Sequence, residues 1–195
     1  QKFPACKLAD VRTAVTKELE QSGFAEKLKP GSRIAIGVGS RGISNIATII
    51  GAVVSYGKSR GFEPFLFPAM GSHGAATAEG QADVLAHYGI HEATMGCPVI
   101  SSLEVVSLGR TEQGIEVFFD KSAFDADAVM LVNRVKWHTD FAGKLESGLF
   151  KMMAIGIGKF AGARQYHTFA FRMGLEAVIR TVGHKVLGTG KIVGG

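Results

Sequence analysis

Two histidines follow apolar runs at places where an open α/β fold could hold a ligand. His73 lies in a glycine-rich loop, PAMGSHGA, which begins within the apolar run 64–69. His138 comes six residues after the end of a second apolar run, 128–132. Both runs are predicted to be buried strands, and open α/β folds place their chemistry where such strands lead into loops. Because the reference pKa of histidine is close to neutral pH, the two side chains suit proton transfer.

Other reactive side chains lie near the second histidine or follow it on predicted helices. The loop after residues 128–132 also contains Lys136, Trp137, Asp140 and Lys144. Lys151 lies on a helix predicted for 146–154, and His167 lies on a helical segment predicted for 161–187. The dipole at a helix start favours anions, so a lysine close to such a start invites a functional explanation.

A third loop, residues 37–42, reads GVGSRG and is predicted to connect a strand to a helix. It satisfies the G-x-G-x-x-G pattern, in which glycines let backbone N–H groups approach a phosphate or carboxylate. A dinucleotide site would also need an acidic residue at the end of the next strand. That strand ends in FPAM, so a dinucleotide is not expected here, and a turn without a ligand is the alternative.

The apolar pattern alternates between short all-apolar runs and longer runs with helical spacing. Strands are predicted at 33–38, 64–69 and 128–132, and helices at 8–28, 43–56, 77–88, 146–154 and 161–187, the last with an interruption near Gly174 or Gly183. This alternation implies parallel strand pairing with right-handed crossovers. We therefore expect an α/β fold with an open, mostly parallel sheet, helices on both faces and a small β excursion near 98–119.

Composition limits the classes of protein to consider. The chain has 195 residues, 46% of them hydrophobic, which is enough for one domain with a sizeable core. No run of eighteen apolar residues occurs, so no membrane span is expected. The net charge of +5 is spread along the chain, which suits a small anionic ligand better than nucleic acid. Cys6 and Cys97, together with the lack of an apolar signal core, predict reduced thiols and a cytoplasmic location.

The candidate residues occur in an order that resembles a known family. In chain order they are Ser40, Arg41, His73, His138, Ala142, Gly143, Ser147, Gly148, Lys151 and His167. Together they are similar to the N-terminal domain of the nickel-pincer lactate racemase family, whose members interconvert the two hands of 2-hydroxy acids. Ser40 and Arg41 match the Thr-Arg of an Asp-x-Thr-Arg-Pro loop in that family, with Val38 in place of the Asp and Gly42 in place of the Pro.

The resemblance implies a catalytic role for each matching residue. His73 and His138 would be the two alternating acid–base groups, and Arg41 with Ser40 would bind the substrate carboxylate. The reaction implied is racemisation or epimerisation of a small anionic 2-hydroxy acid by hydride transfer, which makes the protein an isomerase.

The resemblance also implies a nickel-pincer nucleotide as cofactor, made by dedicated biosynthesis proteins. Lys151 would form the covalent link to it, and His167 would complete the coordination of nickel. The step from His138 to Lys151 is a few residues longer than in the lactate enzymes, so Lys144 is the alternative attachment residue, although the position of the Ser-Gly pair favours Lys151. Because family members have a second domain that closes over the cofactor, we expect residues 1–195 to form a single α/β domain, the N-terminal half of a longer protein, and to be inactive alone.

Two other functions fit parts of the sequence. The first is a nucleotide- or phosphate-binding α/β domain without catalysis, which would use the 37–42 loop and a helix start and would hold no metal. The second is a scaffold for assembly or regulation, in which the histidines would be dispersed and a large apolar patch would be exposed.

Overall fold

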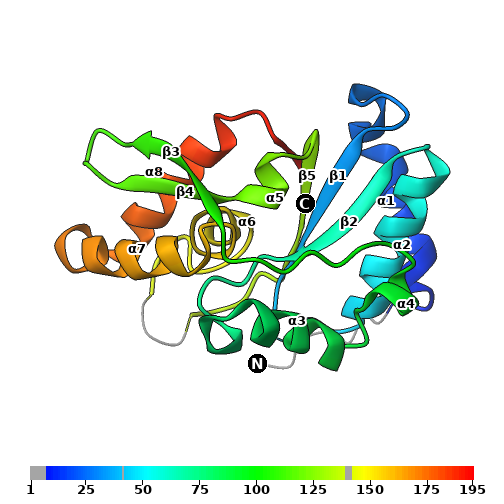
Figure 1. The fold of residues 1–195 in the computed structure, drawn as a ribbon, viewed down its shortest axis with the longest axis horizontal. Helices are drawn as coiled ribbons and strands as arrows, with labels where there is room; N and C mark the ends of the chain where they lie inside the picture. Colours follow the sequence, from blue (N-terminus) through cyan, green and yellow to red (C-terminus); the bar gives the residue numbers. More distant parts are fainter. Residues whose placement is uncertain (1–7, 41, 139–141) are drawn as a thin grey trace.

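A four-stranded parallel sheet forms the centre of the molecule in the computed structural model, which describes residues 8–40, 42–138 and 142–195 (Figure 1). In spatial order the strands are β2 (Glu63–Pro68), β1 (Arg33–Val38), β5 (Ala128–Val132) and β6 (Ile192–Gly194). The predicted α/β fold is confirmed, and β1 and β5 have the predicted bounds. The sequence pattern does not predict β6, because three residues are too few to show a period.

Alternate residues of the strands belong to two separate hydrophobic layers. Ala35 and Phe67 are buried in one layer, whereas their neighbours Ile36 and Leu66 are buried in the other. Successive side chains of a strand point to opposite faces, so the two layers cover the two faces of the sheet. A sheet covered on both faces has strands that are apolar throughout, which explains the unbroken apolar runs in the sequence.

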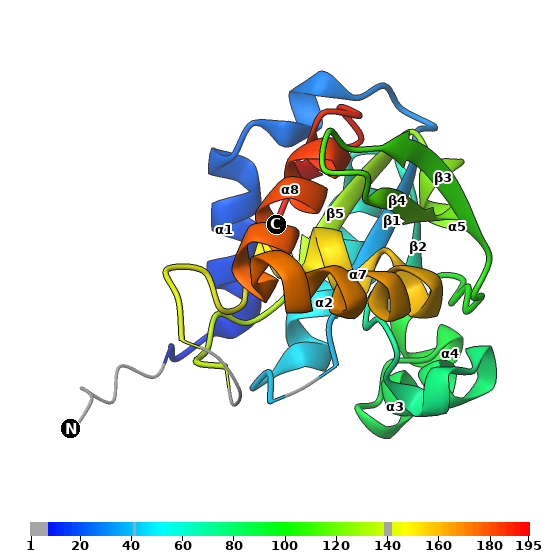
Figure 2. The same ribbon diagram turned by 90° about the vertical axis from the view of Figure 1, so that its left-hand side faces the viewer.

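Helices provide the two covering layers (Figures 1 and 2). One face carries α1 (Val11–Gln21), α2 (Ile46–Ser59) and α3 (Ala78–His87). The other face carries α7 (Lys159–Met173) and α8 (Leu175–Leu187). Short elements complete the fold: α4 (Glu92–Met95), α5 (Lys121–Phe124), α6 (Leu149–Lys151), the 3₁₀ turns Phe24–Lys27 and Gly74–Ala76, and a π-helix at Met152–Gly156.

The small β excursion expected near 98–119 is an antiparallel hairpin of β3 (Val105–Arg110) and β4 (Glu116–Asp120). It lies on the same side of the sheet as α7 and α8 (Figure 1). Val117 and Phe119 of β4 have no exposed surface and are buried in that layer. The hairpin therefore extends the hydrophobic layer beyond the area that the two helices cover.

Several predicted helices have different bounds in the structure. The helix expected at 43–56 is α2, at Ile46–Ser59, three residues further along the chain. The helix expected at 8–28 ends earlier, at Gln21, and a 3₁₀ turn follows Gly23, whose φ of 65° suits glycine. The segment expected at 161–187 is two helices, α7 and α8, divided at Gly174 with φ of 82°. Gly183 does not interrupt α8; a Cβ there would lie 2.5 Å from the ring of Phe150, so this glycine permits close packing.

No helix within the described ranges is both long enough and apolar enough to cross a membrane.

Cys97 is a free thiol, and its burial raises its pKa. Cys6 lies outside the described residues. A buried thiol of raised pKa has little thiolate character, so Cys97 is a packing residue in this fold.

Replacing Tyr166 with Phe tests how α7 is held against the hairpin. The hydroxyl of Tyr166, which is fully buried, accepts a hydrogen bond from the Phe118 N–H at 2.9 Å, and burial raises the pKa of Tyr166 to about 12. The variant would leave that N–H buried without this partner, so we expect the free energy of unfolding in urea to fall by about 1–3 kcal/mol. An unfolding midpoint unchanged from wild type would show that the bond does not stabilise the fold.

Candidate active site

The carboxyl ends of three strands meet at one edge of the sheet. Val38, the last residue of β1, pairs with Pro68 of β2 and with Val132 of β5. The loops that follow these strands enclose a cavity of about 270 Å³ together with the first turns of the α6 segment. Four of the six predicted site residues line it: Ser40, His73, His138 and Lys151.

His73 is held by contacts to its ring and to its backbone. Its Nδ1 lies 2.5 Å from Ser40 Oγ, and the Ser40 carbonyl accepts a hydrogen bond from the Tyr88 hydroxyl at 2.8 Å. The His73 carbonyl accepts a hydrogen bond from Gln81 Nε2 at 3.2 Å. A serine hydroxyl can donate to or accept from an imidazole nitrogen. Where Ser40 accepts from Nδ1–H, the Nε2 atom of His73 becomes the basic nitrogen.

The loop that carries His138 is fastened by Glu146. The Glu146 carboxylate accepts hydrogen bonds from the backbone N–H groups of His138 at 2.7 Å and Gly143 at 3.0 Å. These two bonds, that from His138 first, hold the pKa of Glu146 below its usual range. Glu146 therefore remains ionised at neutral pH and closes the loop between the histidine and the next helix.

Lys151 projects from a short α-helix that changes at once into a π-helix. The predicted helix start at 146 is wrong by three residues, because α6 begins at Leu149 after Gly148, whose φ is 84°. Ser147 Oγ accepts from the Lys136 N–H at 2.7 Å and donates to the Lys136 carbonyl at 2.6 Å. The Ser-Gly pair thus has a physical role: serine ties down the incoming loop and glycine makes the turn into the helix.

The other lysine considered for cofactor attachment has a different position. Lys144 is exposed, lies outside the lining of the cavity, and donates its backbone N–H to Glu176 at 3.0 Å. Lys151 is half-buried and lines the cavity. This geometry favours Lys151 as the residue that could carry a covalently bound group.

His167 lies outside the lining of the cavity. It is exposed on α7, directly after the fully buried Tyr166, and it is not a lining residue. Arg41 and Asp140 lie outside the described residues. Within the described ranges, no group of three or more His, Cys, Asp or Glu side chains could hold a metal ion. The role of His167 as a nickel ligand stays a prediction.

The glycines of the 37–42 loop are explained by close packing. A Cβ at Gly37 would lie 2.9 Å from side-chain atoms of Leu131 and Phe67, and a Cβ at Gly39 would lie 2.9 Å from Asn133 Oδ1. In addition, α2 begins at residue 46, so the loop does not lead directly into a helix start. The glycine pattern therefore does not by itself indicate a phosphate site.

Sequence reasoning did not single out three further residues at the site as functional candidates. Glu146 and Gln81 hold the two histidine loops through backbone atoms, and the guanidinium of Arg134 donates to the Gly42 carbonyl. Arg134 and Glu146 also line the cavity. The position of Arg134, two residues after the end of a predicted strand, was a usable signal, whereas Gln81 lies in the middle of a helix and gave none.

Fold and cavity together define an open α/β domain with a histidine-lined and lysine-lined pocket at the carboxyl edge of its sheet. Residues 5–177 match the family model of the lactate racemase N-terminal domain. Since the match covers most of the chain, the protein belongs to this family, as its motifs predicted. A sequence comparison with curated proteins gave no match. Family membership indicates a lactate racemase-related function.

Replacing Glu146 with Gln tests the fastening of the His138 loop. A carboxyl whose folded pKa lies below its ordinary value of 4.5 stabilises the fold above that value, and this contribution is lost as pH falls through the folded pKa. We expect the Tm of Glu146→Gln to be below that of wild type at neutral pH, with the difference vanishing in acid. Glu112→Gln, which removes the same charge from an exposed turn, is the control. A Tm difference that persists unchanged into acid would contradict this account.

Proposed function

We propose that the chain is the cofactor-holding domain of a nickel-dependent racemase or epimerase of 2-hydroxy acids. The observation that carries the proposal is that His73, His138 and Lys151, three residues in the order of the family motif, line one cavity. A scaffold for assembly would have left the histidines dispersed. A phosphate-binding domain without catalysis would rest on the 37–42 loop, whose glycines already have packing reasons.

The reaction requires two bases because the hydrogen on C2 of a hydroxy acid is not acidic. Removing that hydrogen as hydride, while a base takes the hydroxyl proton, gives a planar keto acid. Return of hydride and proton to either face then gives either hand of the product. One histidine on each side of the substrate meets this requirement.

The residues of this chain support those roles. With Nδ1 held against Ser40, His73 can take the hydroxyl proton at Nε2 on one side of the substrate. His138, on a loop fixed by Glu146, would return or take the proton on the other side. Arg41 is proposed to bind the carboxylate, and Arg134, which lines the cavity, adds positive charge nearby.

The cofactor assignment fits the chain in part. Lys151 is half-buried and lines the same cavity as both histidines, which suits the covalent attachment of a nickel-pincer nucleotide. Such a group supplies a reversible hydride acceptor when bound. His167 does not line the cavity in this structure, so its coordination of nickel is not supported by the present geometry.

Trp137 lines the cavity and is 82% exposed. An exposed tryptophan suits a surface that a second domain covers, which supports the expectation that this domain is inactive alone.

Intact mass and nickel content test the attachment residue. In the full-length protein, co-expressed with the cofactor-making proteins, we expect a mass adduct and bound nickel, both lost in Lys151→Ala and both kept in Lys144→Ala. Loss of the adduct in Lys144→Ala alone would move the attachment to Lys144. An unmodified, metal-free protein under conditions that load a known racemase would contradict the cofactor assignment.

Substitution of the two histidines tests the two-base scheme. His73→Ala and His138→Ala, in the same loaded protein, should each lower kcat for racemisation by about 10²–10⁴-fold, because general acid–base catalysis contributes that much. Circular dichroism should show the fold unchanged, and the adduct should remain. Turnover retained in both variants would rule the scheme out.

A further inference from the structure

Polar side chains are rarely buried in this chain, and those that are converge on one residue. In the part of the chain that the structure describes, four of them are buried: Ser40, Gln81, Asp120 and Lys159. All four connect to His73, either directly or through one another. Burying polar groups is costly unless they are paired, so a set that converges on one histidine calls for a functional explanation.

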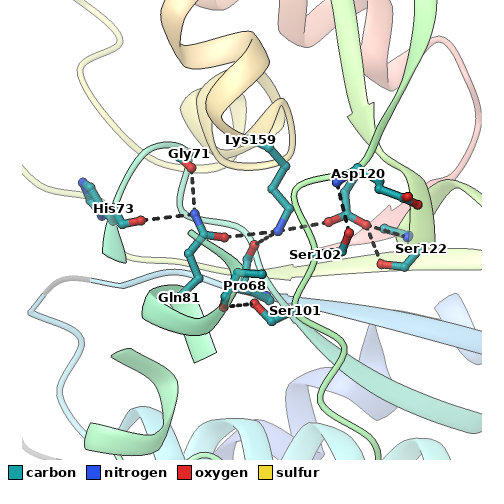
Figure 3. A network of polar contacts seen from close by, with 12 residues as sticks. Pro68, Gly71, His73, Gln81, Ser101, Ser102, Asp120, Ser122 and Lys159 are labelled. Carbon is teal, nitrogen blue, oxygen red and sulfur yellow. Dashed lines mark hydrogen bonds and ion pairs between the residues drawn. The ribbon is translucent and has the colours of Figure 1, made fainter. Parts of the chain in front are cut away.

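Lys159 is at the centre of this network (Figure 3). Its Nζ donates to the Pro68 carbonyl at 2.7 Å and to Gln81 Oε1 at 3.3 Å. Asp120 Oδ2 lies 3.0 Å from the same Nζ, in an ion pair without hydrogen-bond alignment, and neither side chain has exposed surface. The other oxygen of Asp120 accepts from the Ala123 N–H at 2.9 Å. The ammonium group therefore has three oxygen partners, from Pro68, Gln81 and Asp120, and no exposed surface.

Gln81 connects Lys159 to the loop that carries His73 through hydrogen bonds at both ends of its amide. Its Nε2 donates to the carbonyls of Gly71 at 2.8 Å and His73 at 3.2 Å (Figure 3). One end of an amide only donates and the other only accepts, whereas an ammonium only donates. Lys159 must therefore face Oε1, and this turns Nε2 toward the two loop carbonyls. Without the lysine, Oε1 would lose its donor, and only the two bonds from Nε2 to the loop carbonyls would hold the amide.

The buried charge and the backbone conformation of Lys159 both lower the stability of the fold. Burial lowers the pKa of Lys159, an effect that the neighbouring Asp120 opposes. Lys159 also has a φ of 54°, in the left-handed region that non-glycine residues seldom adopt. Apolar residues would fill the same space at lower cost in many folds. Strain and buried charge together at one residue beside a candidate site point to a functional constraint.

We propose that Lys159 and Asp120 act through Gln81 as positioning residues for His73. They hold the backbone of the loop while Ser40 holds the imidazole, so that one ring tautomer is kept and the basic nitrogen has a fixed place. The inference rests on the proposed function, in which His73 is one of the two bases.

Three variants separate positioning from general stability. Gln81→Met removes both hydrogen bonds to the loop and leaves the Lys159–Asp120 pair in place. Lys159→Met alone would leave a buried, unpaired carboxylate and could unfold the chain, so it is combined with Asp120→Asn, which keeps an oxygen for the Ala123 N–H. The control is Ser122→Ala, which removes a hydrogen bond of 2.5 Å to Asp120 Oδ1 at the far end of the network and leaves Gln81 intact.

The readout is the ring of His73 in the full chain labelled with ¹⁵N-histidine. Nitrogen chemical shifts of the neutral imidazole report which nitrogen carries the proton, and His73→Ala assigns the signal. We expect one tautomer in wild type and Ser122→Ala, and a mixture in Gln81→Met and in Lys159→Met/Asp120→Asn. In the loaded full-length protein, the same two variants should lower kcat about 10- to 100-fold with a smaller change in KM, because the base is displaced and not removed.

An unchanged tautomer in Gln81→Met would overturn the proposal, as would an equal disturbance in Ser122→Ala. The spectrum does not depend on turnover, so it separates this inference from the proposed function. If His73→Ala and His138→Ala both retained turnover, the two-base scheme of the proposed function would fail, while the tautomer comparison would still decide the positioning role. If His73→Ala lost turnover and Gln81→Met kept wild-type kcat and one tautomer, the positioning role alone would be rejected.

Discussion

The in-register parallel pairing of β1, β2 and β5 is the constraint on which the site depends. Because Val38 pairs with both Pro68 and Val132, the three strands end at the same level and their loops begin side by side. The loops that carry Ser40, His73 and His138 are far apart in the sequence and therefore lie side by side in the fold. A shift of one strand by one residue would carry its loop away from the cavity and turn its apolar side chains to the opposite layer.

The cavity joins two segments whose closeness depends on glycine. The Gly71 N–H donates to the Gly156 carbonyl at 3.3 Å, and a Cβ at Gly156 would lie 2.6 Å from the Ala69 carbonyl oxygen. Gly156 ends the π-helix that follows Lys151, and Gly71 comes two residues before His73. The lysine and the histidine are thus carried by segments in backbone contact, so a movement of one would be passed to the other. Wide turns of this kind occur often at functional sites.

Local patterns predicted β1, β2 and β5 and drew attention to His73 and His138, because buried parallel strands are recognisable as apolar runs and sites follow their ends. The supporting network could not be predicted in the same way. Lys159 contacts Gln81 across 78 residues of sequence and Pro68 across 91, and the sequence near it, GIGKFAGA, resembles an ordinary helix start. A glutamine inside α3 likewise has no local mark of function. The significance of both residues comes from tertiary contacts, which periodicity and spacing do not encode.

The orientation of α7 limits how a cofactor could use His167. Tyr166 is fixed in the core by its bond to Phe118, and adjacent helix residues point about 100° apart, so His167 stays at the surface while α7 keeps this orientation. Turning α7 to bring His167 inward would break that bond and disturb Lys159 at the start of the same helix. A group attached to Lys151 inside the cavity and bound to His167 would therefore have to extend beyond the cavity to the outer surface. The nickel-ligand role of His167 therefore stays a prediction, and it requires either a changed orientation of α7 or a group that reaches past the lining of the cavity.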